Sequence, residues 1–135
     1  MRRLRTAAPV RLTLAWLPAV AWAGVIFALS ATPNLRVAES EVVDLIVRKA
    51  GHMAEFGTLA LLAWRAFAYS RLRGAVVLSL ALTAAYAGSD EFHQSFIAGR
   101  TASPVDVGID SAGALIALLA LVAWLRFRAR GRPVA

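Results

Sequence analysis

Four long apolar stretches, joined by shorter polar connections, dominate the pattern of hydrophobic and polar positions along this chain. About 20 largely apolar residues in helical form cross the roughly 30 Å of hydrocarbon in a bilayer. The pattern therefore predicts an all-α integral membrane protein, folded as a single domain over residues 1–135 as a four-transmembrane-helix bundle. The expected spans cover residues 12–30, about 50–69, about 75–96 and about 104–125.

The connections carry their own signals. In the longest one, residues 31–48, Val42, Leu45 and Ile46 recur at helical spacing, which predicts a short amphipathic segment at the membrane interface. The last span has a clear start signal: Ser103 as N-cap, Pro104 in the first turn, and Asp106 at the third position of a capping box.

The first apolar stretch has two interpretations. The basic start MRRLR and the small residues ALSA (28–31) resemble a cleaved signal peptide. However, the apolar run is longer than the usual 7–15 residues of a signal-peptide core, so we favour a retained helix.

Composition agrees with the membrane interpretation. Hydrophobic residues make up 59% of the chain, against about 45–50% in a soluble domain. The chain has no cysteine, which excludes disulfides and a thiol nucleophile. The formal net charge of +7 would suggest nucleic acid in a soluble protein, but here we expect arginines flanking the membrane and no nucleic-acid partner.

Basic and acidic residues are distributed unequally between the two sides of the predicted membrane. With four spans, the two tails and the connection between the second and third spans share one side, which holds 11 basic residues and no acid. The positive-inside rule therefore predicts that both termini are cytoplasmic. All 8 acids and both histidines fall on the other half, so we expect the chemistry to lie on the extracytoplasmic face.

Several ionisable residues lie at membrane depth. Asp110 is about 10 Å inside its helix and Asp90 is roughly two turns from the end of its own, by the 1.5 Å rise per residue. Such groups cost at least about 2.5–3.5 kcal/mol and usually face a partner or a wet cavity. Arg100 is a natural partner for one of the carboxylates. We expect one cluster near the outer leaflet, made of His52, Glu55, Asp90, Glu91, Gln94, Arg100, Asp106 and Asp110.

Each member also has a plainer interpretation. Lys49 could be a solvated flank, Asp106 a helix cap, and Glu91 a residue facing lipid headgroups. His52 and Glu55, three positions apart, could form an interhelical hydrogen bond with no other role.

Three classes of function fit the cluster. The first is binding of, or chemistry on, an envelope lipid or peptidoglycan precursor, with Lys49, Gln94, Arg100 and Asp106 binding the substrate and His52, Glu55, Asp90, Glu91 and Asp110 as catalytic candidates. The second is a hydrolase or transferase with a divalent metal held by His52, Glu55, Asp90 and Asp110. The third is polar contact between helices, worth about 0.6 kcal/mol per contact on average.

Two stretches resemble a known family of small bacterial membrane proteins. They are KAGHMAEFGTLALL (49–62) and YAGSDEFHQSFIAGRTASPVDVGIDSAGALIAL (86–118). The first carries a basic residue, then His52 and Glu55; the second carries D-E-x-x-Q, then G-R, then two aspartates and a glycine. Together with S-A-T-P at 30–33, they resemble the VanZ-like family. Ala98 departs from the proline that the family often has before G-R.

The resemblance implies a multi-pass protein of the cell envelope in which these polar residues form a common site. The family's name-giving member is associated with low-level resistance to the glycopeptide antibiotic teicoplanin. The resemblance therefore raises antibiotic resistance as an expectation for this chain.

Overall fold

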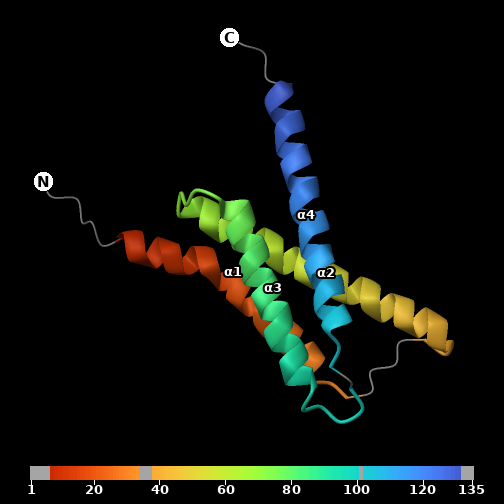
Figure 1. Ribbon diagram of the computed structural model, residues 1–135. Coiled ribbons are helices and arrows are strands. Elements are labelled where there is room, and N and C mark those ends of the chain that lie inside the picture. The colour runs from red at the N-terminus through yellow and green to blue at the C-terminus, as the bar shows by residue number, and fades with distance from the viewer. Residues whose placement is uncertain (1–6, 34–37, 101, 132–135) are drawn as a thin grey trace, which may run out of the picture.

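The computed structural model describes residues 7–33, 38–100 and 102–131, which form four α-helices and no strand. Figure 1 shows their arrangement. The expected all-α fold with four helices is confirmed. The helices are α1 (Ala7–Ser30), α2 (Glu41–Tyr69), α3 (Ala75–Gln94) and α4 (Pro104–Arg130).

The start of α2 differs from the sequence prediction. The helix begins at Glu41 rather than near residue 50, and no proline interrupts it. The expected amphipathic segment is therefore the first turns of α2 and not a separate element. The Asp44 carboxylate accepts a hydrogen bond from the Ala38 backbone N–H at 3.3 Å and pairs with Arg48 at 2.9 Å. These contacts stabilise the first turn of the helix.

Helix α2 is the central element. It packs against α1, α3 and α4, whereas α1 and α4 do not pack on each other within the described ranges. In Figure 1, α4 crosses α2, and the N-terminal part of α2 and the C-terminal part of α4 extend beyond their neighbours. The structure is therefore a more open arrangement than a bundle of parallel helices.

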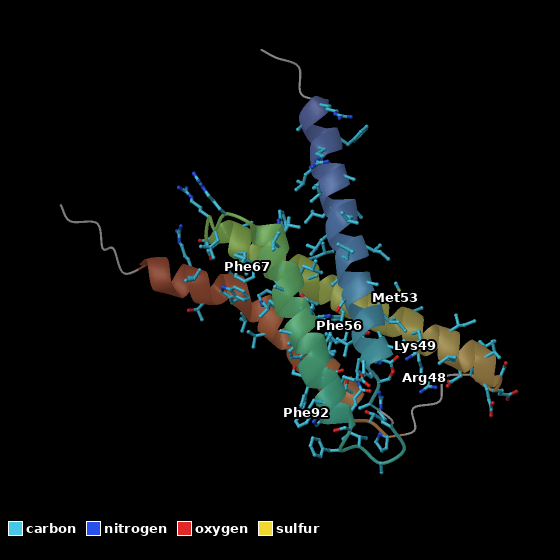
Figure 2. The ribbon with its side chains drawn as sticks, in the orientation of Figure 1. Arg48, Lys49, Met53, Phe56, Phe67 and Phe92 are labelled. Atoms are coloured by element: carbon cyan, nitrogen blue, oxygen red, sulfur yellow. The ribbon has the colours of Figure 1, made fainter. Side chains whose placement is uncertain are left out.

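Two glycines allow α2 and α4 to cross at close range. A Cβ atom at Gly113 would lie 2.6 Å from the Cα atom of Met53, and one at Gly57 would lie 3.2 Å from the Gly113 carbonyl oxygen. Figure 2 labels Met53 at this crossing. Small residues at such contacts let helix backbones approach each other in membrane proteins.

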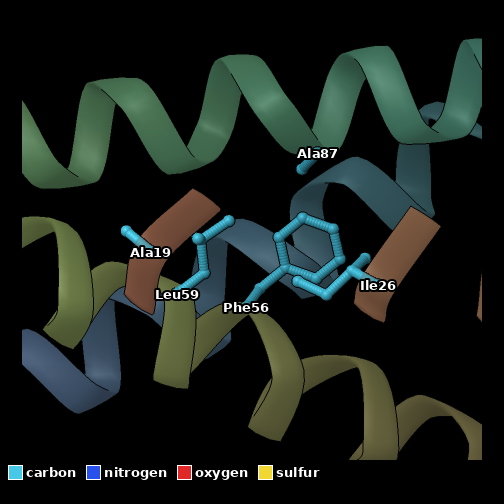
Figure 3. Close-up of a cluster of buried hydrophobic side chains, with 5 residues drawn as sticks. All are labelled: Ala19, Ile26, Phe56, Leu59 and Ala87. Atoms are coloured by element: carbon cyan, nitrogen blue, oxygen red, sulfur yellow. The ribbon is translucent and has the colours of Figure 1, made fainter. Parts of the chain in front are cut away.

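The largest buried cluster joins α1, α2 and α3. Figure 3 shows the Phe56 ring between Ile26 of α1 and Ala87 of α3, with Leu59 and Ala19 beside it. Two hydrogen bonds fix α1 to this core: the Trp22 indole N–H donates to the Glu55 carbonyl at 2.9 Å, and the Tyr86 hydroxyl donates to the Ala23 carbonyl at 2.7 Å.

The outer surface is apolar. Large hydrophobic side chains are exposed on all four helices, among them Val20 at 64%, Val77 at 70% and Phe127 at 77%. Two helical segments, Arg11–Ser30 and Pro104–Arg130, are long and apolar enough to cross a membrane. An apolar surface of this extent suits a lipid environment. The number of crossings and the sides of the termini stay predictions.

Candidate functional site

A polar cavity lies where the C-terminal ends of α1 and α3 meet the start of α4 and the N-terminal half of α2. Its volume is about 440 Å³. Most of the polar residues singled out from the sequence line it or lie directly behind its wall. The lining residues are Leu29, Ser30, Leu45, Val47, Arg48, Lys49, Gly51, His52, Glu55, Gln94, Gly99, Arg100 and Asp106.

Asp90 is the centre of a hydrogen-bonded chain at the base of this region. Its carboxylate is 2% exposed, and Oδ2 accepts from Ser30 Oγ and from Gln94 Nε2, both at 2.8 Å. The amide oxygen of Gln94 then accepts from Arg100 Nη1 at 2.8 Å, and Arg100 Nη2 donates to the Thr32 carbonyl at 3.2 Å. This chain joins the end of α1, the end of α3 and the connection that follows α3.

Arg100 corrects one expectation. It does not pair with a carboxylate; its two hydrogen bonds go to the neutral oxygens of Gln94 and Thr32. Among the described residues, therefore, no acid within ion-pair distance balances the guanidinium charge. The reason is that Gln94, one turn after Asp90, occupies the position between the carboxylate and the arginine.

Lys49 and Asp106 form an ion pair between α2 and α4. Lys49 is therefore not simply a solvated flank. Figure 2 shows Lys49 and Arg48 on the part of α2 next to the start of α4. Ser103 is confirmed as N-cap, since its hydroxyl accepts from the Val105 backbone N–H at 3.2 Å. The expected capping box with Asp106 is wrong, because the Asp106 carboxylate binds Lys49 instead.

Glu91 takes the place that Asp106 would have in a capping box. It is 6% exposed, and its Oε1 atom accepts from the Ser103 backbone N–H at 2.5 Å. A residue of α3 thus satisfies the first free donor of α4. The alternative in which Glu91 faces lipid headgroups is wrong.

Replacing Glu91 with alanine should lower the free energy of unfolding by about 1.5–3 kcal/mol, the usual range for a hydrogen bond to a charged group. Denaturant unfolding in detergent micelles measures the shift. Glu41→Ala is the matched control, because Glu41 is an exposed acid in the first turn of α2 and contributes only about 0.3–1 kcal/mol to its helix. Equal shifts for the two variants would argue against the role assigned to Glu91.

His52 and Asp110 face each other between α2 and α4. The distance from His52 Nδ1 to Asp110 Oδ1 is 3.4 Å, and neither atom has a hydrogen-bond partner among the described residues. Asp110 is 1% exposed and lies behind His52, which lines the cavity. Glu55 also lines the cavity, three positions along α2 from His52, and neighbours at this spacing share a helix face.

The residues proposed as metal ligands are divided between separate contacts. Asp90 is bound by Ser30 and Gln94, whereas Asp110 faces His52. In the part of the chain that the structure describes, no group of three or more His, Asp or Glu side chains is arranged to hold a metal ion. The set His52, Glu55, Asp90 and Asp110 therefore does not fit a metal centre.

Two residues of the hydrogen-bonded chain around Asp90 and Arg100 are not among the site residues predicted from the sequence. Ser30 is 2% exposed and donates to Asp90, and Thr32 supplies a carbonyl to Arg100. The sequence signal for both residues is the S-A-T-P run at 30–33, which resembles the opening of the family. His93, in contrast, lies outside the cavity lining and stacks on Phe27 with ring centroids 4.2 Å apart.

Comparison with known proteins identifies a family for this chain. No curated protein and no solved structure matches the chain significantly. The profile of the VanZ/LLP1 family matches residues 6–126, a range that includes every residue of the cavity lining. The chain therefore belongs to the VanZ/LLP1 family, and this membership and its two long apolar helices indicate a membrane protein.

Proposed function

We propose that this protein binds the anionic headgroup of an envelope lipid or cell-wall precursor in the cavity between its helix ends, and so affects susceptibility to teicoplanin-type glycopeptides. The observation that carries the proposal is Arg100, a cation at a cavity of about 440 Å³ with no carboxylate in contact among the described residues. The link to glycopeptides comes from the family alone.

Arg100 is the cavity residue that favours an anion, and the Glu55 carboxylate lines the same cavity. Arg48 and Lys49 are each paired with a carboxylate, Asp44 and Asp106 respectively. Arg100 is not. A guanidinium has five N–H donors in a fixed fork that matches phosphate and carboxylate groups, and the described contacts of Arg100 use two nitrogens. The remaining donors can bind an anionic oxygen that enters the cavity.

The apolar part of the lining suits a lipid. Leu29, Leu45 and Val47 lie on the cavity wall, and each is more than 40% exposed. A hydrocarbon chain packed on them would remove apolar surface from water, at about 25 cal/mol per Å². A ligand with a charged head and an apolar tail therefore matches both halves of the cavity.

The proposed orientation places the cavity at the outer face of the bacterial cytoplasmic membrane, with both termini inside. In single-cysteine variants of intact cells, Ala102→Cys should react with a membrane-impermeant maleimide, and Arg73→Cys should react only after lysis. Both positions are exposed, and the natural chain has no cysteine. Protection of residue 102 with labelling of residue 73 would reverse the orientation.

Replacing Arg100 with glutamine should weaken binding of phosphatidic acid and phosphatidylglycerol by about 10–100-fold, because charged hydrogen bonds contribute about 1.5–3 kcal/mol. Lipid binding by the purified full chain is measured in phosphatidylcholine vesicles, and vesicles with each anionic lipid are compared with vesicles without it. In cells, any teicoplanin protection by the chain should fall at equal protein level.

Arg73→Gln is the matched control, since it removes an exposed arginine far along the chain from the cavity lining. If Arg100→Gln binds both lipids as the natural chain does, the proposal fails. An equal loss in both variants would mean that the lipids bind through general surface charge, which also contradicts a site at Arg100.

A further inference from the structure

We propose that the cavity is also a catalytic site, which hydrolyses a lipid phosphate monoester with His52 as general base and Asp110 as its positioning residue. This inference rests on the proposed function, because it requires that the headgroup bind beside Arg100. It adds a reaction and a substrate class to the binding site.

The first step of the argument is the pair of unpartnered atoms. Asp110 Oδ1 and His52 Nδ1 are both buried, lie 3.4 Å apart, and have no hydrogen-bond partner among the described residues. Buried polar atoms are nearly always hydrogen-bonded, so two that face each other need an explanation. Catalytic hydrogen bonds are often long without substrate and shorten when it binds.

The second step of the argument concerns the tautomer of His52 that the contact with Asp110 favours. When this contact shortens to a hydrogen bond, the Asp110 carboxylate accepts from Nδ1–H and fixes the tautomer in which Nε2 has a free lone pair. Asp110 is too buried, at 1% exposed, to meet a ligand itself. Its role is therefore to orient His52, which lines the cavity.

The third step is the substrate class. His52 follows Lys49 by three positions on α2, so the two side chains project from the same helix face, and both line the cavity with Arg100. A terminal phosphate has three free oxygens and a charge near −2 at neutral pH. A phosphodiester has fewer free oxygens and one charge. Arg100, which has no carboxylate in contact among the described residues, and Lys49, which shares its charge with Asp106, therefore offer a monoester two N–H donor groups beside one imidazole.

The proposed reaction balances without a further reagent. A water oxygen attacks phosphorus and forms a new P–O bond, while the bond from phosphorus to the lipid oxygen breaks. His52 takes a proton from the water and returns it to the leaving lipid oxygen. Arg100 and Lys49 stabilise the charge on the phosphoryl oxygens. The products are a lipid alcohol and inorganic phosphate.

The test uses the purified full chain in phosphatidylcholine vesicles that contain dioleoyl phosphatidic acid, and it measures released inorganic phosphate. His52→Ala should lower kcat by about 10²–10⁴-fold, and added imidazole should restore part of the rate. Asp110→Asn should lower kcat while leaving the KM for the lipid unchanged. His93→Ala is the matched control and should keep the natural rate, since His93 stacks on Phe27 outside the cavity lining.

The outcomes separate this inference from the proposed function. Binding of phosphatidic acid that depends on Arg100, with no phosphate release, overturns the inference and leaves the binding function standing. Absence of binding overturns both. Release at the natural rate by both His52→Ala and His52→Gln also overturns the inference. The imidazole rescue distinguishes a folded variant without its base from a misfolded one.

Discussion

Replacing Gly113 with alanine is expected to force α2 and α4 apart and to lower the free energy of unfolding by about 3 kcal/mol, at the upper end of the usual range for overpacking. The added methyl group would lie 2.6 Å from the Met53 Cα atom and 2.8 Å from its carbonyl carbon. Both are backbone atoms, so no side-chain rotation can relieve the contact, and the helices themselves must move.

The same helix provides the control. A Cβ atom at Gly108 would meet nothing within 4 Å, so Gly108→Ala should stabilise α4 by about 0.5–1 kcal/mol through the lower conformational entropy of the unfolded chain. Tryptophan fluorescence during denaturant unfolding in micelles reports both variants, since the chain has four tryptophans. If Gly113→Ala shifts the midpoint as little as Gly108→Ala, the crossing is not as close as the structure shows.

The crossing also determines the geometry of the site. Asp110 is three positions before Gly113 on α4, and His52 directly precedes Met53 on α2. The contact between His52 and Asp110 and the ion pair between Lys49 and Asp106 both join these two helices. A separation of the backbones at Gly113 would therefore lengthen both contacts. We expect Gly113→Ala to impair ligand binding even where the protein remains folded.

The helices could be predicted because hydrophobic runs and caps are local signals. The expected third span, about 75–96, corresponds to Ala75–Gln94, and Pro104 begins α4 as expected after the Ser103 cap. The start of α2 could not be predicted from apolar length, because residues 41–49 are too polar to count as a span. They are still helical, since the Asp44 contacts with Ala38 and Arg48 stabilise the first turn.

The sequence could indicate that polar residues gather at these helix ends, but not which of them contact each other. Helical spacing places Gln94 one turn after Asp90, and in the structure the Gln94 amide donates a hydrogen bond to Asp90 at 2.8 Å. Contacts between helices depend on the rotation of each helix and on the path of the connections, and a single sequence contains no direct signal for either. The contact of Ser30 with Asp90 and that of Glu91 with Ser103 are of this kind.

In the alternative interpretation, the polar residues only hold the helices together, and the structure shows which residues fit this role. Asp90 fits that role through its Oδ2 atom, which accepts from two protein donors in a buried position, while its Oδ1 atom has no partner among the described residues. Arg100 fits it less well, because its charge is not paired with an acid among the described residues. A structural residue and a ligand-binding residue should therefore respond differently to substitution.

Replacing Asp90 with leucine should lower the free energy of unfolding by about 2–6 kcal/mol, because Ser30 and Gln94 would each lose their acceptor at a cost of about 1–3 kcal/mol per buried group. An ordinary interhelical contact contributes about 0.6 kcal/mol, so the two cases can be separated by denaturant unfolding. Asp90→Asn retains one acceptor oxygen and should lose less. Ser89→Ala is the control, since Ser89 is exposed and bonds only the local Tyr86 carbonyl at 2.7 Å.

The cellular readout completes this prediction. Because Asp90 supports the fold, teicoplanin susceptibility in the Asp90→Leu variant should follow protein abundance, whereas Arg100→Gln should lose function at natural abundance. Immunoblotting alongside susceptibility measures the difference. If Asp90→Leu stays abundant and stable but inactive, Asp90 acts in the chemistry of the site rather than in its support. If Arg100→Gln instead loses abundance in step with function, the arginine is structural and the anion-binding proposal falls with it.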